Sequence, residues 1–309
     1  MRILFIASNR VGDAVLSTGL LDHLIRCHPD ARITVACGRP AAGVFARMPR
    51  CEHVLVIDKQ RWDLHWLSLW GWAALRRWDL VVDIRGSALA YMVWARRRAV
   101  MRRRPGHKIA QLAAVLGISP PPAPIAWTGP EDDRRAALLL PPDRPVIALG
   151  PTANWAPKVW PPERFAALFH ALAEGPLAGA VPVVLGGPGA EERALAAPVL
   201  ALLPGAIDLC GALSLAEAAA CLRRASLFVG NDSGLMHLAA AAGTATIGLF
   251  GPTEAQVYAP VGPRVVAVCA DGGSMVDLPV AKVAAAARSL LAIGTPAGDR
   301  RDGLISACG

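Results

Sequence analysis

The sequence lacks both of the common glycine-rich nucleotide motifs. The loop after its first expected strand reads NRVGD at residues 9–13, where a nicotinamide or flavin enzyme would carry GxGxxG. The pattern GxxxxGK followed by Ser or Thr is missing throughout, which disfavours a P-loop ATPase or kinase. No apolar run approaches the roughly 18–20 residues that a membrane-spanning helix requires. The sequence therefore favours none of these three classes.

Cysteine pairs with a recognisable spacing are also missing. The seven cysteines are an odd number and show neither a CxxC pair nor a Cys/His ligand spacing. We therefore expect reduced, mostly buried thiols, with no disulfide and no metal site. The N-terminal segment MRILFIASNR has an apolar run too short for a signal peptide, so it is expected to form a first β-strand of a cytoplasmic protein.

What the sequence does have is a large apolar fraction in alternating strand and helix patterns. Hydrophobic residues make up 54% of the 309 residues, and this length suits two domains of about 150 residues each. Strands are expected at 3–7, 33–36, 53–57, 80–84, 146–149, 181–185, 207–209, 227–229, 246–250 and 265–268, and helices at 14–27, 40–48, 62–78, 162–174, 191–203, 214–224, 235–242 and 279–292. This alternation predicts an α/β protein with doubly wound parallel sheets.

A Pro-rich, non-periodic stretch at 118–145 interrupts the alternation. It predicts a boundary between a first domain, 1–145, and a second domain, 146–293, with residues 294–309 as a loose tail. Two similar α/β domains that face each other form a cleft. Because ligands of parallel sheets bind beyond the carboxyl ends of the strands, we expect the functional residues in the loops that follow the strands.

The stretch 227–253 carries the most specific pattern: strand, turn, helix, turn and strand. Its turn, Asp232-Ser233-Gly234, precedes a strongly helix-forming segment. The unpaired N–H groups at such a helix start favour a phosphate or a polar sugar. His237 shares a helix face with Ser233. A lone helix histidine is more often structural than catalytic, and with no nucleophile elbow or acidic triad partner evident, hydrolase chemistry is disfavoured.

Three further loops hold candidate residues, each with a plainer alternative. Asp13 is either the N-cap of the first helix or a general base facing the cleft. Thr152 and Lys158 suit a diphosphate, although Lys158 is otherwise a solvated lysine. In GGPGAEE at 186–192, Glu191 and Glu192 are either partners of the helix dipole or acceptors for ribose hydroxyls.

Positive charge is concentrated in the first half. Residues 1–144 contain 22 Lys+Arg and 12 Asp+Glu, a net +10, whereas the remainder contains 10 and 12, a net −2. Arginine runs at 96–98 and 102–104 are either solvated or bind a phosphorylated lipid, and no recognised nucleic-acid motif accompanies them. Trp62, Trp66 and Trp70 share a helix face that suits either core packing or a membrane interface.

Together these segments resemble the ADP-heptose:lipopolysaccharide heptosyltransferases of glycosyltransferase family 9. The resemblance covers about residues 1–292 in order. Its specific part is DSGLMHLAAA followed by FGPT, within 213–253, and the collinear segments are NRVGD at 9–13, DLVVDIRG at 79–86, KVWP at 158–161 and GGPGAEE at 186–192. It implies a GT-B fold, two Rossmann-like domains that face a central cleft. It also implies an inverting, metal-independent transfer from an ADP-sugar, without a cofactor.

The resemblance also implies roles for individual residues. Asp13 would be the general base. The donor would be held by Thr152, Lys158, Glu191 or Glu192, Leu213 through its backbone, Asp232, Ser233, Gly234 and His237. The basic first domain would bind the acceptor, with Arg10, Arg85, Arg102, Arg103 and Arg104 as candidates.

The leading hypothesis is transfer of heptose to a lipopolysaccharide inner-core acceptor of the lipid A/Kdo type. The partners would be an ADP-sugar and an anionic glycolipid, with peripheral contact at the inner membrane surface and no nucleic acid. One alternative is a family-9 transferase with another nucleotide-sugar donor, or with a protein or capsular glycan as acceptor. The other is an idle nucleotide-sugar-binding scaffold, which would be expected to lack Asp13 or Lys158.

Overall fold

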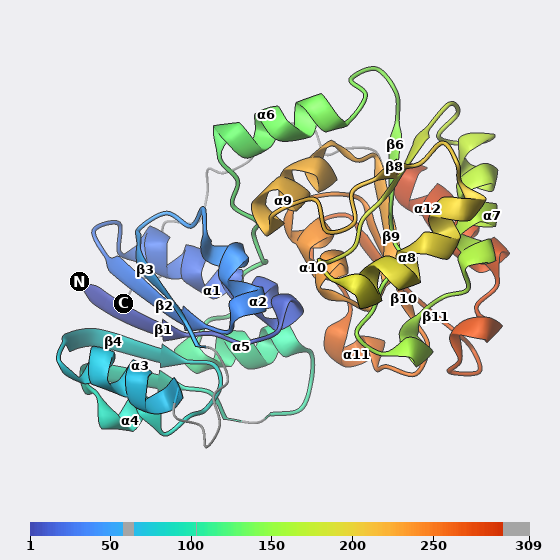
Figure 1. Cartoon of the computed structure of the whole chain (residues 1–309). Coiled ribbons are helices and arrows are strands. Elements are labelled where there is room, and N and C mark those ends of the chain that lie inside the picture. Colours follow the sequence, from blue (N-terminus) through green and yellow to red (C-terminus); the bar gives the residue numbers. More distant parts are fainter. Residues whose placement is uncertain (58–64, 103, 293–309) are drawn as a thin grey trace.

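The chain forms two parallel α/β sheets that lie side by side (Figure 1). The computed structural model describes residues 1–57, 65–102 and 104–292. The first sheet has the order β3-β2-β1-β4-β5 and the second β11-β10-β9-β6-β7-β8. The strands are β1 (Arg2–Ile6), β2 (Arg32–Cys37), β3 (Cys51–Val56), β4 (Arg77–Asp83), β5 (Trp94–Val100), β6 (Val146–Gly150), β7 (Val181–Val184), β8 (Ile207–Asp208), β9 (Leu227–Asn231), β10 (Thr246–Phe250) and β11 (Val265–Cys269). We call each sheet with its helices the first and the second α/β unit.

Helices cover both faces of each sheet (Figure 1). The α-helices are α1 (Val11–Cys27), α2 (Arg39–Ala42), α3 (His65–Ala74), α4 (Leu89–Met92), α5 (Lys108–Leu116), α6 (Pro130–Leu139), α7 (Pro162–Ala173), α8 (Ala190–Leu202), α9 (Leu215–Arg224), α10 (Gly234–Ala241), α11 (Ala255–Tyr258) and α12 (Val280–Ala292). Short 3-10 turns occupy Gly43–Phe45, Ala156–Lys158 and Met275–Asp277. Among the described residues, no helix is both long and apolar enough to cross a bilayer.

The alternation of side chains along β1 explains why both faces of the first sheet are covered. Ile3 and Phe5 lie in the hydrophobic cluster that contains the buried residues of α1. Leu4 and Ile6 point to the opposite face and lie in a separate cluster with Leu69 of α3. Since successive strand residues face opposite sides, an unbroken apolar run such as ILFI needs helices on both.

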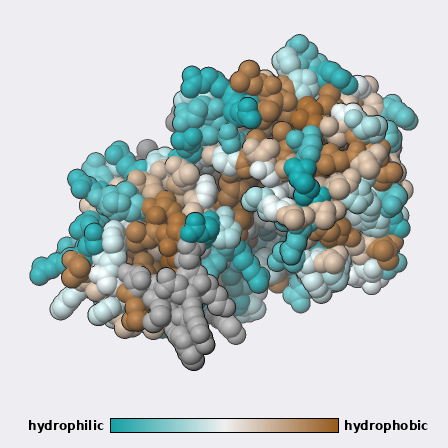
Figure 2. All heavy atoms as spheres, in the orientation of Figure 1, coloured by the Kyte–Doolittle hydropathy of each residue, from teal (hydrophilic) through white to brown (hydrophobic). Residues whose placement is uncertain are grey.

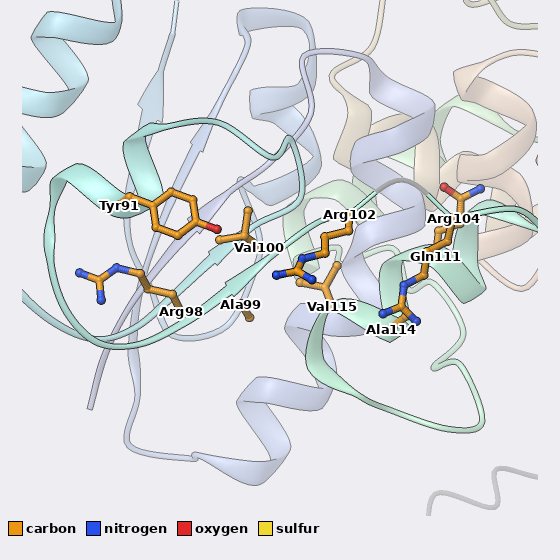
Figure 3. A pocket seen from close by; sticks show the side chains of 9 residues that line it. All are labelled: Tyr91, Arg98, Ala99, Val100, Arg102, Arg104, Gln111, Ala114 and Val115. Carbon is orange, nitrogen blue, oxygen red and sulfur yellow. The ribbon is translucent and has the colours of Figure 1, made fainter.

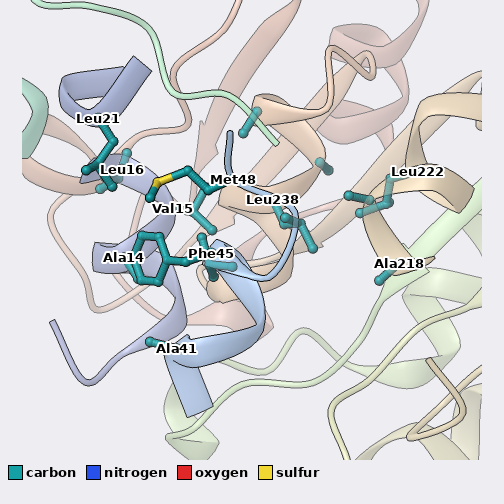
Figure 4. Packing of buried hydrophobic residues seen from close by; sticks show 14 of the residues in the cluster. Ala14, Val15, Leu16, Leu21, Ala41, Phe45, Met48, Ala218, Leu222 and Leu238 are labelled. Carbon is teal, nitrogen blue, oxygen red and sulfur yellow. The ribbon is translucent and has the colours of Figure 1, made fainter. Parts of the chain in front are cut away.

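The two units share one apolar core at their junction. In the space-filling view they are two lobes joined by a narrower waist (Figure 2). Figure 4 shows Val15 of α1 and Phe45 close to Leu238 of α10, and all three belong to one buried cluster that also includes Leu222 of α9. Packing of α1 against α10 therefore sets how the two sheets meet.

The segment that connects the two units is hydrogen-bonded to both. The N–H of Ile125 donates to Oγ1 of Thr18 in α1, at 2.8 Å. The N–H of Ala126 donates to the carbonyl of Ala241 at the end of α10, at 3.1 Å. The connection is therefore held between the helices that form the junction.

The Pro-rich stretch 118–145 contains a helix that sequence analysis missed. Helix α6 begins with Pro130, and Oδ2 of Asp132 accepts from the N–H of Gly129 at 2.8 Å. Arg47 of the first unit donates to both carboxylate oxygens of Asp132, at 2.8 and 3.2 Å. Because α6 also packs against α9 of the second unit, it bridges the two units.

Other differences from expectation lie in the first unit. The helix expected at 62–78 is shorter: α3 ends at Ala74, and Trp78 is a buried residue of strand β4. Strand β5 and helix α5 were not expected, since WARRRAV reads as a charge run. Strand β5 lies at the edge of the first sheet, where exposed arginines are tolerated. Trp62 and the expected tail lie outside the described residues.

The expectation of reduced thiols holds for five of the cysteines in the described part of the chain. Cys37, Cys51, Cys210 and Cys221 are free, and burial raises the pKa of each of these thiols. Cys269 is free and exposed.

Candidate active site

The starts of two helices meet where the two units face each other. A Cβ at Gly234, the first residue of α10, would lie 2.9 Å from Cβ of Val11 and 3.3 Å from the backbone nitrogen of Gly12. A Cβ at Gly12 would in turn lie 3.0 Å from Cδ2 of His237. Only glycine allows this close approach. It brings together the loop after β1 and the loop after β9, so that two positively polarised helix ends share one site.

Asp13 lies in the first turn of α1, on the first-unit side of this junction. The helix begins at Val11 with Arg10 at the N-cap position, so Asp13 is not the N-cap considered from the sequence. Its carboxylate accepts from Oγ of Ser8 at 3.3 Å, and Ser8 Oγ accepts from the N–H of Arg10 at 3.2 Å. The half-buried carboxylate is held at the junction and keeps access to a ligand.

Lys158 and Asp232 form an ion pair on the second-unit side. Nζ of Lys158 lies 2.7 Å from Oδ2 of Asp232, and their side chains are 19% and 9% exposed. Because the pair is partly buried, its attraction is screened less than that of a surface pair. Sequence analysis placed both residues at a donor site, and the structure brings them together.

Asn231, the last residue of β9, holds the Lys158 loop in place. Its side-chain nitrogen donates to the carbonyl of Pro151 at 2.8 Å, and its side-chain oxygen accepts from the N–H of Trp160 at 3.0 Å. Asn231 is fully buried. Trp160 is also fully buried and donates through Nε1 to the carbonyl of Leu278 at 2.9 Å. The sequence pattern did not single out Asn231.

Two buried polar atoms at the start of α10 have no partner within the described part of the chain: Oγ of Ser233 and Nδ1 of His237. Buried polar groups are normally hydrogen-bonded, so such atoms at a helix N-terminus mark a place where a ligand completes the hydrogen bonding. Burial lowers the pKa of His237 to about 4, although the nearby carboxylates of Asp232 and Asp13 act to raise it. His237 is therefore neutral at physiological pH.

The remaining expected donor residues follow other strands of the second sheet. Thr152 is buried after β6. Glu192 folds back onto the glycine loop, where its Oε2 accepts from the N–H of Gly187 at 3.1 Å, whereas Glu191 is exposed. Leu213 is half-buried just before α9, whose N-cap Ser214 exchanges hydrogen bonds with Glu217. All of these positions lie beyond the carboxyl ends of parallel strands, as expected for a ligand site.

Sequence analysis missed two residues beside this site. Burial, and then the carboxylate of Asp13, raise the pKa of Tyr258 at the end of α11. His107 accepts at Nδ1 from the N–H of Ile109, at 3.3 Å, which makes Nε2 the donor to the carbonyl of Ala259, at 3.1 Å. His107 thus links the first unit to the second. Tyr258 could have been noticed in the sequence because it is one of two tyrosines and closely follows the FGPT turn.

The expected acceptor arginines do not form one cluster around Asp13. Arg10 is at the N-cap of α1. Arg85 follows β4 and donates to Oδ1 of Asn9 at 2.9 Å. Arg102 and Arg104 instead line a cavity of about 300 Å³ beside β5 and α5 (Figure 3). Arg103 lies outside the described residues. Two arginines therefore flank the loop after β1, and two lie at a separate cavity.

The described residues contain no group of three or more His, Cys, Asp or Glu side chains arranged to hold a metal ion. The charged groups of the site are Asp13, the Lys158–Asp232 pair and the flanking arginines. Such a set can abstract a proton on one side of the junction and bind an anion on the other.

Comparison with known proteins identifies the family. The model of glycosyltransferase family 9 (heptosyltransferase) matches residues 91–284, more than half of the chain. This chain belongs to glycosyltransferase family 9. The glycosyltransferase is 25% identical over 310 residues to lipooligosaccharide heptosyltransferase 2 of Haemophilus influenzae, with 85% of this chain and 87% of the relative covered.

Solved structures of the family have the same fold. A family 9 glycosyl transferase from Veillonella parvula superposes with a TM-score of 0.81 at 21% identity, covering 95% of this chain and 97% of that one. The E. coli ADP-heptose lps heptosyltransferase II superposes with a TM-score of 0.77 at 21% identity, covering 95% and 99%. The predicted GT-B fold of this family 9 glycosyltransferase is confirmed.

Proposed function

We propose that this family 9 glycosyltransferase transfers heptose from ADP-heptose to a lipopolysaccharide inner-core acceptor, with inversion and with Asp13 as the general base. The observation that carries the proposal is the junction of α1 and α10. There the first turn of α1, which carries Asp13, lies against the start of α10, next to Asp232 of the Lys158–Asp232 pair and the unpartnered Ser233 Oγ. The names of the H. influenzae and E. coli relatives support the sugar and the acceptor class.

The reaction needs one base and one anion site. Asp13 takes the proton of an acceptor hydroxyl while that oxygen forms a bond to the anomeric carbon of the donor sugar. The bond from that carbon to the diphosphate breaks on the opposite side, and ADP leaves with the electron pair. Attack opposite the leaving group inverts the anomeric centre. Asp232 is paired with Lys158, so Asp13 is the carboxylate left to act as the base in this direct displacement, which requires no covalent intermediate.

The negative charge on the departing diphosphate is met by the second unit. The N–H groups at the start of α10 and the ammonium group of Lys158 supply positive charge where it develops. Ser233 Oγ and His237 Nδ1 supply the hydrogen bonds that their burial otherwise leaves unmade. With His237 neutral, it can form a hydrogen bond without repelling Lys158. This arrangement stabilises the leaving group without a metal ion.

The nucleoside is assigned to the loops that follow β6, β7 and β8. Thr152, Gly187 and Leu213 come from these three loops, so the ADP moiety extends from α10 across the second sheet. Between the two glutamates we assign the ribose contact to Glu192, because its carboxylate is fixed against the glycine loop by Gly187. A carboxylate held in this way can accept two ribose hydroxyls without first becoming ordered.

The acceptor is assigned to the first unit. Arg10 and Arg85 flank the loop that precedes Asp13, which places positive charge where a Kdo carboxylate or a phosphate would lie during transfer. In this assignment residues 1–145 form the acceptor domain and residues 146–293 the donor domain. Closure of the two domains would exclude water and limit hydrolysis of the donor.

The experiment that tests this function is thermal unfolding of the protein with ADP, UDP, GDP, CMP and ADP-heptose. A ligand at ~100 times its dissociation constant stabilises the folded state by roughly 2.7 kcal/mol. We expect a rise in Tm with ADP and ADP-heptose alone. A rise with UDP or GDP instead would keep the transferase and reject the heptose donor. No rise with any nucleotide would reject the donor site itself.

A further inference from the structure

Half of the exposed large apolar side chains of the described residues lie in one stretch of the first unit. The described chain exposes twelve of them, and six lie between residues 67 and 94. Five of the six form what we call the aromatic face: Leu67, Trp70, Tyr91, Met92 and Trp94. Trp94 is 74% exposed and Tyr91 65%. Single exposed apolar residues are common, but a contiguous group marks an interaction site.

The aromatic face is continuous across α3 and α4. Leu67 and Trp70 are three residues apart on α3 and so share one side of that helix. Nε1 of Trp70 donates to the carbonyl of Met92 at 3.0 Å, which joins α3 to the end of α4. Figure 1 shows the two short helices together on the outer side of the first sheet. Leu67, Trp70 and Met92 therefore lie together, and Tyr91 and Trp94 are within two residues of Met92 in the chain.

These side chains are not needed for the core beneath them. The two helices bury Leu69, Ala73, Leu89 and Ala90 against the first sheet. The inner sides of the helices already cover the sheet, and the outer apolar residues remain 40–74% exposed. A partner that removes them from water would account for their presence.

The surroundings of the aromatic face are strongly basic. Residues 65–104 contain nine arginines and only two acidic residues, with no lysine. Of the two acids, Asp83 is buried and accepts four hydrogen bonds from residues 85–87. Asp79 accepts from the backbone N–H of Arg2 at 2.8 Å and lies 3.8 Å from Arg96, whose side chain is 85% exposed. This charge attracts an anionic partner and repels a second copy of the same basic surface.

A cavity beside the aromatic face offers a place for an anionic group. Tyr91 belongs to both, and Arg98, Arg102 and Arg104 line the cavity (Figure 3). The guanidinium of Arg98 is occupied by the carbonyls of residues 90, 93 and 95, so it shapes the wall. Arg102 and Arg104 are exposed, and their guanidinium groups suit a phosphate oxygen.

The aromatic face also leads to the proposed catalytic loop. The guanidinium of Arg85 lies 4.8 Å from the ring centroid of Trp66 in α3, and Arg85 donates a hydrogen bond to Asn9. Asn9 lies four residues before Asp13. A lipid-borne acceptor whose chains rest at α3 and α4 would thus have its polar head within reach of the cleft.

We propose that the aromatic face docks on an anionic phospholipid surface, with Trp70, Tyr91 and Trp94 in the headgroup zone and the surrounding arginines on lipid phosphates. Tryptophan and tyrosine favour that zone because one end of the ring system is apolar and the other polar. Arginines beside them add attraction to anionic lipids. The proposal rests on the proposed function only for the idea that the acceptor lies in the same membrane.

The test is co-sedimentation of the full chain with vesicles of phosphatidylglycerol and phosphatidylethanolamine, without nucleotide or acceptor. We expect binding that weakens with added salt and is much weaker on phosphatidylcholine vesicles. The double variant Met92→Ser/Trp94→Ser should bind at least about tenfold less, since both side chains would leave the interface. The matched control is Leu138→Ser, which changes an 82% exposed leucine on α6 and should bind like the wild type.

Two companion measurements separate the outcomes. An ADP-induced rise in Tm of the double variant equal to that of the wild type shows that the variant is folded. If ADP does not raise the Tm of the wild type, that result concerns the donor site alone and not the aromatic face. Sedimentation velocity shows whether the face joins two copies instead. Equal vesicle binding by the double variant and Leu138→Ser, no binding by the wild type at low salt, or a dimer that the double variant dissociates would each overturn the proposal.

Discussion

Nζ of Lys158 lies 2.7 Å from the carboxylate of Asp232, although 74 residues separate the two in sequence. In the absence of a donor each side chain neutralises the other. An arriving diphosphate competes with Asp232 for the ammonium group, which is already positioned at the start of α10. The pair therefore keeps a positive charge ordered at the anion site, which lowers the cost of binding.

Lys158→Ala should weaken ADP binding by at least about tenfold, because a hydrogen bond to a charged group is lost. The carboxylate of Asp232 would also be left unpaired near the diphosphate. Isothermal titration calorimetry measures the change. Lys282→Ala is the matched control, since that lysine pairs with Asp271 on the surface. Equal ADP affinity in both variants would remove Lys158 from the diphosphate site.

Asp13→Asn should reduce transfer by at least about 100-fold, the lower end of what a general base contributes. The variant keeps the size of the side chain and its contact with Ser8, so ADP affinity should stay within about twofold. Single-turnover kinetics and ADP titration measure the two effects separately. Near-normal turnover would rule out Asp13 as the base.

The two neighbouring glutamates provide a matched pair. Glu192→Gln should weaken binding of ADP and leave binding of inorganic diphosphate unchanged, because the carboxylate is assigned to the ribose. Glu191→Gln should change neither, since that side chain is exposed. Competition assays with both ligands separate the sites. If Glu191→Gln is the variant that loses ADP affinity, the assignment must be reversed.

His237 should make stability depend on pH. Burial lowers its pKa to about 4, below the value of about 6.5 in an unfolded chain. Between these values the unfolded chain binds more protons, so the contribution of neutral His237 is complete above about pH 6.5. It should fall by up to roughly 3 kcal/mol as pH drops toward 4. Urea unfolding at pH 7.5 and pH 5 should show a smaller difference for His237→Gln than for the wild type. The same difference in both would contradict the buried, neutral histidine.

The close approach of the two helix starts predicts the effect of one methyl group. Gly234→Ala should destabilise the fold by about 1–3 kcal/mol, because the new Cβ would press on Val11 and on the backbone of Gly12. Gly71→Ala is the control. A Cβ there meets no described atom within 4 Å, and alanine favours a helix by up to about 1 kcal/mol. Denaturant unfolding of both variants checks the sign. Equal stability would show that the junction can adjust.

The sequence predicted the parts of the fold that carry strong local patterns. Apolar runs of four or five residues, such as 3–6 and 246–250, identify buried parallel strands because both faces must be apolar. The edge strand β5 escaped, since its exposed arginines mask that pattern. Helix α6 escaped for a different reason: proline was taken to indicate a linker, although at the first turn of a helix it is favourable.

The same distinction applies to the residues of the candidate site. Asp13, Lys158 and Asp232 were found because their residue types and positions after strands carry the chemistry. Asn231 and Tyr258 were not, since their importance lies in what they contact in space. The five arginines predicted to bind the acceptor were also treated as one group, whereas Arg85 and Arg102 belong to different places that only the arrangement of β4 and β5 separates.

The connecting segment has a mechanical consequence. It is tied to Thr18 on one side and to Ala241 on the other, and a Cβ at Gly19 would lie only 2.5 Å from the carbonyl oxygen of Pro122. This segment is packed closely against α1 and has little room to move relative to it. A change in the angle between the two units would pivot near this segment, so displacement would grow with distance from it. Ligands that bind both units far from the segment would therefore have the greatest effect on that angle.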